Sequence, residues 1–165
     1  MGNTRDITFF CASAMQASKR FTLALDVRRQ QQKKVPILLQ ADFFFRLSDS
    51  PLVFPEGSQL KITQLRGEVI GKEEYEIAFL CCDLVEETIV AYGGMQQPLK
   101  IPLIAVISMT DSLERQDCVE KLPSPCRLSV TEAQNAHIYL LDTSGQNIAP
   151  MYHAFLTLTF EIFKP

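Results

Sequence analysis

The chain has 165 residues, 47% of them hydrophobic, which is enough to bury one core of ordinary size. Its 16 basic and 19 acidic residues give a net charge of −3, which argues against a surface that works mainly by neutralising phosphates. The longest apolar runs, such as 101–107, are far shorter than the roughly 18 to 20 residues needed to cross a bilayer, so we expect no membrane span.

Segments in which every second residue is apolar recur along the chain, and this period predicts β-strands with one buried face. In the first half they cover 6–11, 21–27, 35–47, the segment that starts near Leu60, and 75–81. Three consecutive phenylalanines, Phe43 to Phe45, indicate that both faces of the third of these strands are covered.

The strand that starts near Leu60 changes phase along its length. Leu60 and Ile62 share one face, but Leu65 falls out of that alternation and Gly67 follows. This pattern predicts a β-bulge. Further along, Gly71-Lys72 predicts a hairpin turn into the strand over 75–81.

The second half of the chain continues the strand pattern. A short β-branched strand over 88–92 ends at Gly93-Gly94, and apolar residues from 99 to 107 alternate with Pro102 on the opposite face. Because proline has no backbone donor, we expect this strand at a sheet edge or with a local irregularity. The last strands are predicted over 126–130, 136–141 and 153–163, with a polar turn over 142–147. Residues 109–121 form a poor apolar stripe and are predicted to be a surface loop with one short helical turn at most.

About eight to ten short antiparallel strands with little helix predict an all-β fold, and the lack of alternating helical segments argues against a parallel α/β sheet. We interpret residues 1–165 as a single β-sandwich domain, because no internal repeat or linker interrupts the pattern. A strand number near eight combined with long loops is typical of a jelly roll, which is the architecture we expect.

The two histidines, His137 and His153, are the best candidates for chemistry. Each opens a predicted strand, so together with Asp142 they would suit a general base or a metal pair. The alternative is two polar residues at strand ends, and we favour it because no metal-binding motif or nucleophile motif accompanies them. We therefore expect no catalytic residues, no cofactor and no metal.

Five cysteines form an odd set without the spacing of a redox or zinc motif. Cys81 and Cys82 lie in an apolar strand, where cysteine behaves as a small buried hydrophobe, and a Cys118–Cys126 bridge is the less favoured alternative. The first residues lack the apolar stretch of a signal peptide. These features predict synthesis in a reducing cytoplasmic compartment.

Two sets of surface candidates stand out in the sequence. The basic run contains Arg28, Arg29, Lys33 and Lys34 and would suit phosphate or acidic partners, but we favour a solvated loop, so nucleic acid is not expected as the main partner. The apolar set flanks a loop, and we interpret it as a buried subunit interface. Its members are Phe43, Phe44, Phe45, Leu52 and Phe54.

The C-terminal third resembles a known family. Cys126-Arg-Leu-Ser-Val130, His137-Ile-Tyr-Leu-Leu-Asp-Thr-Ser-Gly-Gln-Asn147 and Phe155-Leu-Thr-Leu-Thr-Phe160 are similar to the closing strands of small viral jelly-roll capsid proteins. These are the penton-type and minor capsid proteins of adenovirus-like and virophage-like DNA viruses. The resemblance implies a role in virion assembly and no catalytic residues. Residues 1–6 do not form a basic arm, so a role in packaging the genome through such an arm is not implied.

Three functions follow from these patterns, in order of preference. The first is a non-enzymatic structural or assembly protein, a viral capsid or virion component, that self-associates as a homo-oligomer or joins other structural proteins. The second is a ligand-binding β-sandwich for a glycan, a peptide or a small molecule, which requires an exposed aromatic platform. The third is an enzyme on a cupin-like barrel, which two histidines make hard to build.

Overall fold

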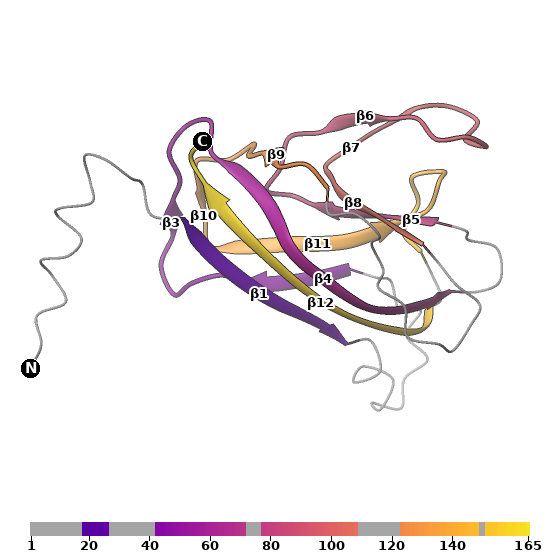
Figure 1. The fold of residues 1–165 in the computed structure, drawn as a ribbon, viewed down its shortest axis with the longest axis horizontal. Helices are drawn as coiled ribbons and strands as arrows, with labels where there is room; N and C mark the ends of the chain where they lie inside the picture. The colour runs from indigo at the N-terminus through magenta and orange to yellow at the C-terminus, as the bar shows by residue number, and fades with distance from the viewer. Residues whose placement is uncertain (1–17, 27–41, 72–76, 109–122, 149–150) are drawn as a thin grey trace, which may run out of the picture.

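The computed structural model describes residues 18–26, 42–71, 77–108, 123–148 and 151–165, and all regular structure in these ranges is β-strand (Figure 1). No helix in this part of the chain has the length and apolar character needed to cross a membrane. The strands are β1 (Lys19–Asp26), β2 (Asp42–Arg46), β3 (Leu52–Val53), β4 (Gln59–Gly71), β5 (Ile77–Cys82), β6 (Thr88–Val90), β7 (Leu99–Ile101), β8 (Leu103–Ser108), β9 (Cys126–Arg127), β10 (Glu132–Ala133), β11 (Asn135–Leu141) and β12 (Met151–Phe163).

Two four-stranded sheets form the body of the fold. One has the strand order β1-β12-β4-β9 and the other has the order β2-β11-β5-β8, and every pairing within them is antiparallel. Two smaller pairs, β3 with β10 and β6 with β7, complete the described strands. The predicted all-β sandwich is confirmed.

The main hydrophobic core lies between the two sheets. It is contributed by alternate residues of both, because alternate residues of a strand face the same side. Phe160 of β12 and Leu60 of β4 enter it from one sheet, and Leu80 of β5 and Ile138 of β11 enter it from the other. All four of these side chains are buried almost completely, so the two sheets are packed without an intervening layer.

The predicted bulge in β4 is present. Thr159 of β12 pairs with Gln64, and the next residue of β12, Phe160, pairs with Ile62, so Thr63 is the extra residue. The bulge keeps Leu65 on the buried face together with Ile62, although the two are three positions apart in the sequence. The Thr63 hydroxyl donates to the Thr159 carbonyl at 3.2 Å and holds the irregular step in place.

The predicted irregularity at Pro102 is also present and has a structural consequence. The proline separates β7, which pairs with β6, from β8, which pairs with β5 at the edge of its sheet. The carbonyl of Pro102 still accepts a hydrogen bond from the Cys82 amide at 3.0 Å. Pro102 therefore marks the point where the chain passes from the β6–β7 hairpin into the β2-β11-β5-β8 sheet, and the hairpin is not part of that sheet.

Other sequence predictions were wrong in detail. Gly71-Lys72 was expected to join two paired strands, but β4 and β5 belong to different sheets, so no hairpin links them. Both faces of the strand containing Phe43 to Phe45 were expected to be covered, yet Phe44 is 76% exposed, and none of the described strands lies over that face of β2. The two-residue strands β3 and β10 were not predicted at all, because two residues carry no period. The strand expected over 6–11 and the loop expected over 109–121 lie outside the described residues.

Candidate functional site

The outer face of the β2-β11-β5-β8 sheet has a second, smaller apolar cluster. Ile77, Phe79 and Cys81 of β5 point to this face, opposite to their neighbours in the main core. The β6–β7 hairpin covers them with Leu99 and Ile101 (Figure 1). As a result β5 is buried on both faces, with Phe79 0% exposed.

The cover does not reach β2, where an aromatic strip remains at the surface. Phe44 of β2 lies directly opposite His137 of β11, and the two rings stack with centroids 4.2 Å apart and an angle of 6° between their planes. Tyr139, two residues along β11, continues the strip at 4.7 Å from His137. Together, Phe44, His137 and Tyr139 form an ordered aromatic strip that runs from the uncovered edge to the covered cluster.

Tyr139 marks the boundary between the exposed and the covered parts of this face. Its ring packs against the outer apolar cluster, and partial burial, followed by the negative charges that Cys81 and Asp83 carry when ionised, raises the pKa of its phenol to about 12. The phenol therefore stays protonated at ordinary pH and can donate a hydrogen bond.

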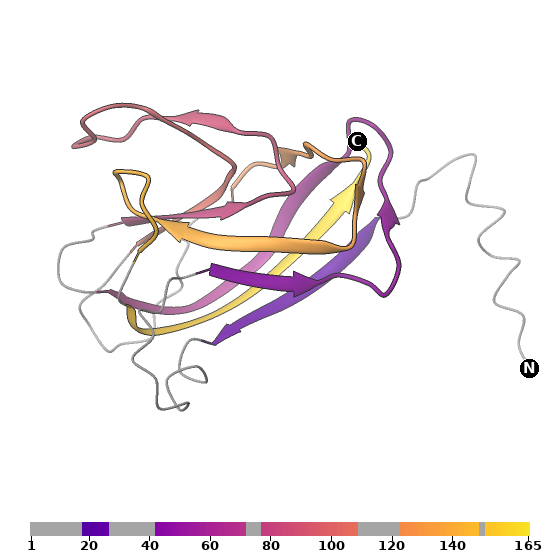
Figure 2. The ribbon, with the colours of Figure 1, turned by 180° about the vertical axis from the view of Figure 1, so that it is seen from behind.

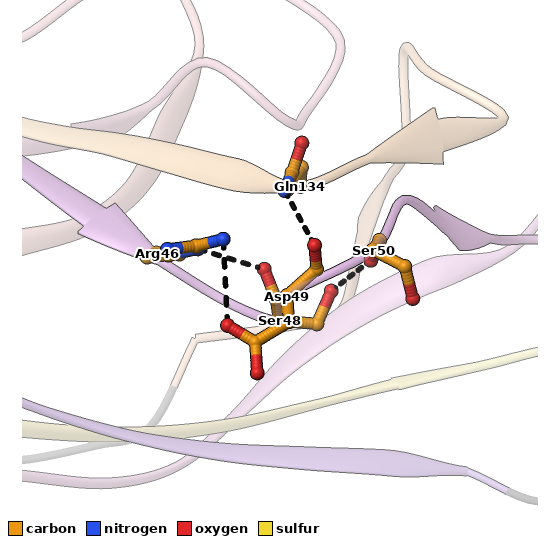
Figure 3. Close-up of polar contacts among 5 residues, drawn as sticks. All are labelled: Arg46, Ser48, Asp49, Ser50 and Gln134. Carbon is orange, nitrogen blue, oxygen red and sulfur yellow. Dashed lines mark hydrogen bonds and ion pairs between the residues drawn. The ribbon is translucent and has the colours of Figure 1, made fainter.

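The end of β2 is fixed by polar contacts with the turn that follows it (Figure 3). The Arg46 guanidinium donates through Nε to the Ser48 carbonyl at 3.3 Å and forms an ion pair with Asp49 at 3.4 Å. The Gln134 side-chain amide donates to the Asp49 carbonyl at 2.9 Å, which ties this turn to the segment before β11. The Arg46 side chain itself stays largely exposed.

The structure divides the apolar set that was predicted to form an interface. Phe43 and Phe54 are buried in the main core, and Phe45 and Leu52 pack against that core. Phe44 alone of the five is a large exposed side chain. The five residues therefore do not share one surface, because the alternation of β2 turns Phe43 and Phe45 inward and Phe44 outward. Val53, which the sequence analysis did not select, is also exposed.

The other predicted site residues do not come together. His137 and His153 lie on β11 and β12, which belong to different sheets. Asp142 organises its own turn, since its Oδ1 accepts from the backbone amides of Ser144 at 2.8 Å and Gln146 at 3.0 Å. Within the described ranges no three His, Cys, Asp or Glu side chains are grouped so as to hold a metal. The basic set Arg28, Arg29, Lys33 and Lys34 lies outside the described residues.

The described cysteines are free thiols in apolar surroundings. Burial raises the pKa of Cys81 to about 12, and burial, with a further contribution from Asp83, raises the pKa of Cys82 to about 12. Cys126 is half-buried, and its thiol donates to the Leu103 carbonyl at 3.4 Å. Thiols protonated to such high pH are poor nucleophiles, so these two residues fill space as the sequence predicted.

Two clefts lined by described residues lie away from the aromatic strip, since neither is lined by Phe44, His137 or Tyr139. The larger, about 370 Å³, lies between β8 and the segment around Pro125, with Glu86 and Arg127 at its rim. The smaller, about 260 Å³, lies beside Phe54 and Ile162, with Lys19 and Lys164 close by. No histidine lines either of these two clefts. The larger contains two carboxylates, and each forms an ion pair at 3.4 Å, Glu86 with Arg127 and Glu87 with Lys100.

No protein-family model, curated protein or solved structure matches this chain. The fold and the surface chemistry therefore carry the functional argument. The place of His137 in an aromatic strip was not predicted, because the stack depends on the register between β2 and β11 and not on sequence spacing. The sequence offered two signals for this strip. His137 and Tyr139 are two residues apart in one predicted strand, and Phe44 lies in another.

Proposed function

We propose that the chain is a non-enzymatic structural protein that self-associates into a larger assembly, on the jelly-roll framework of the small viral capsid proteins that its C-terminal third resembles. The proposal combines an architecture with a surface. The strand order supports the architecture, and the apolar side chains that the β6–β7 hairpin leaves exposed on the outer face of one sheet support the interaction surface.

The pairing of the eight strands that make up the two four-stranded sheets supports a jelly roll. In the order of the chain, the first pairs with the last (β1 with β12), the second with the seventh (β2 with β11), the third with the sixth (β4 with β9) and the fourth with the fifth (β5 with β8). A chain folded into such nested antiparallel pairs and then rolled into two facing sheets has jelly-roll topology. Many capsid and lectin domains use this framework, so it favours binding and assembly modules without selecting one.

The observation that carries the assembly function is the apolar outer face of the β2-β11-β5-β8 sheet. Phe44 lies at one edge, 76% exposed, and Val106 of β8 lies at the other, 41% exposed and directly opposite Phe79. Between them the β6–β7 hairpin covers only the middle. Large apolar side chains left on a sheet face mark an interaction site, because leaving them in water has a free-energy cost that association removes.

The oligomeric state tests the proposal directly. Size-exclusion chromatography with light scattering, run from about 1 to 200 µM, should give a mass that rises above the 18.6 kDa of one chain. A strict monomer over this range, with no mass increase at the highest concentration, contradicts self-association.

A second candidate function, ligand binding, is favoured by the aromatic strip. Planar stacking of Phe44 on His137 presents a flat ring surface of the kind that sugars and other flat ligands contact. A glycan array probed with the wild-type protein and with Phe44→Ala separates the two functions. Hits that disappear in the variant support a ligand site, whereas the absence of hits removes the glycan version of this candidate.

Synthesis in a reducing cytoplasmic compartment is the location that we propose for this protein before any assembly. The free thiols of Cys81, Cys82 and Cys126 support it. Titration of the unfolded protein with a thiol reagent, without prior reduction, should detect all five cysteines of the chain as free thiols. A lower count would indicate disulfide formation and contradict this location.

A further inference from the structure

We infer that β2 is the dimerisation element of this chain, and that two copies join β2 to β2 about a twofold axis at Phe44 to form one continuous eight-stranded sheet. The inference rests on the proposed self-association and names the surface and the register through which it occurs.

The backbone of β2 has an unpaired edge at the described end of its sheet. In the strand order β2-β11-β5-β8, only β11 pairs with β2 among the described residues, and Figure 2 shows the two strands side by side. An open edge next to a large exposed apolar side chain is a template for another strand. One edge of the other sheet is β1, where the exposed side chains over 19–24 are Arg20, Thr22 and Ala24, with Arg20 ion-paired to Glu161. Within 19–24 this edge exposes no large apolar side chain.

The hydrogen bonds of His137 show which backbone groups of β2 face this edge. The His137 amide donates to Asp83 Oδ1 at 2.9 Å, and its carbonyl accepts from the Asp83 amide at 3.1 Å, so both groups point toward the β5 side. His137 and Phe44 are therefore a non-hydrogen-bonded pair across β11 and β2. The N–H and C=O of Phe44 therefore point away from β11, toward the edge of the sheet. Because the backbone groups of successive residues in a strand point to opposite edges, those of Asp42 and Arg46 point the same way as those of Phe44.

The sequence of β2, Asp-Phe-Phe-Phe-Arg, is self-complementary in this orientation. When a second copy runs antiparallel about Phe44, Phe44 faces Phe44 of the second copy. Asp42 of each copy then faces Arg46 of the other, which gives two opposite-charge contacts. Opposite charges directly across two strands stabilise the pairing, and like charges weaken it. A parallel arrangement would place like charges side by side, and a shift of two residues would leave both charges without a partner. The charge pattern therefore selects one partner, a second copy, and one register.

The twofold register also uses the exposed aromatic ring. Residues that face each other across two strands point to the same side of the sheet, so the two Phe44 rings meet on the outer face, each already stacked on its own His137. Their backbones exchange both hydrogen bonds, as expected for a facing pair whose Cα atoms are about 5.5 Å apart. An isologous contact of this kind closes as a dimer and cannot propagate into a fibre. The ion pair of Arg46 with Asp49 is exposed and weak, so it does not prevent Arg46 from reaching its partner.

Charge reversal provides the sharpest test. In a dimer of Asp42→Arg, arginine faces arginine at both contacts, and in a dimer of Arg46→Asp, aspartate faces aspartate at both. Each variant alone should therefore associate at least ten times more weakly than the wild type in sedimentation equilibrium. An equimolar mixture of the two variants restores both opposite-charge contacts and should associate within about threefold of the wild type. Ile89→Glu, which places an acid at an exposed apolar position on the distant β6–β7 hairpin, is the matched control and should leave association unchanged.

The outcomes separate this inference from the proposed function. If the wild type associates but both reversed variants associate equally well, or if their mixture stays monomeric while the wild type does not, the β2 interface is wrong and self-association uses another surface. If the wild type is a monomer at every concentration, the proposed function is wrong and the inference falls with it. Circular dichroism of each variant, with the wild-type spectrum expected, excludes unfolding as the cause of lost association.

Discussion

Strands β5 and β2 belong to the same sheet and are both rich in apolar residues, yet they end in opposite environments. All six residues of β5 are buried, whereas β2 buries Phe43 and leaves Phe44 at the surface. The difference is not in the strands themselves. It comes from the β6–β7 hairpin, which leaves the sheet at Pro102 and folds over β5 without reaching β2. A strand in this molecule is therefore buried on its second face only where a distant segment covers it.

The largest test of this contrast compares the same substitution on the two strands. Phe79→Ala should lower the free energy of unfolding by about 3–5 kcal/mol, because it removes a fully buried ring and leaves a cavity under the hairpin. Phe44→Ala should cost about 1 kcal/mol or less, since it removes only the stack on His137. Urea unfolding at low protein concentration, where association does not contribute, gives both values. Equal losses would mean that the hairpin does not cover β5.

A second test uses the thiols on the two faces of β5. Above pH 9 the thiols of the unfolded chain ionise, while burial keeps Cys81 and Cys82 protonated up to pH 12 in the folded chain. The unfolded state then binds fewer protons, so the free energy of unfolding falls as pH rises from 9 toward 12. Between pH 8 and pH 10 the two thiols together should contribute a loss of about 2–3 kcal/mol.

Single variants assign that loss to each face. Cys82 belongs to the main core and Cys81 to the cluster under the hairpin. Cys81→Ala and Cys82→Ala should each remove about half of the additional pH dependence measured by urea unfolding between pH 8 and pH 10. An unchanged slope in Cys81→Ala would show that water reaches this thiol and that the hairpin is an incomplete cover.

The sequence predicted the parts of this fold that depend on local pattern. Alternation predicted the long strands β1 and β12, the slip between Ile62 and Leu65 predicted the bulge in β4, and Pro102 predicted the break before β8. Each of these is a property of a few consecutive residues, so no knowledge of the partner strand was needed.

The candidate site depended on contacts between distant segments and was therefore only partly predictable. Three consecutive phenylalanines look equally apolar on both faces, and only the reach of the β6–β7 hairpin decides that Phe44 is exposed. The stack of Phe44 on His137 requires the register between β2 and β11, which no local period specifies. The polar strand-end interpretation of His137 missed this contact for the same reason.

A third prediction concerns the turn that supports the hairpin. Gly145 has a positive φ of 82°, and a Cβ atom there would lie 3.2 Å from Cδ2 of Leu99 on β7. Gly145→Ala should therefore lower the free energy of unfolding by about 1–2 kcal/mol, through backbone strain and displacement of the hairpin. Gly93→Ala is the matched control, because no atom lies within 4 Å of the added methyl group and its φ is not positive, and it should change stability by less than about 0.5 kcal/mol. Thermal unfolding of both variants measures the difference, and a Gly145→Ala variant as stable as Gly93→Ala would show that the turn does not support the hairpin.

The smallest expected effect distinguishes the two faces of the hairpin itself. Ile101 of β7 is buried against β5, while Ile89 of β6 is 78% exposed and faces away from the sheet, beside Lys100. Ile101→Val should cost about 0.5–1.5 kcal/mol because it removes one buried methylene, and Ile89→Val should cost nothing measurable because the methylene it removes lies in water. Both variants keep a β-branched side chain, so strand propensity is constant between them. A measurable loss in the free energy of unfolding for Ile89→Val would mean that the outer face of the hairpin is also covered. The burial of β5 would then depend on a covering layer larger than the hairpin, and so would its contrast with β2.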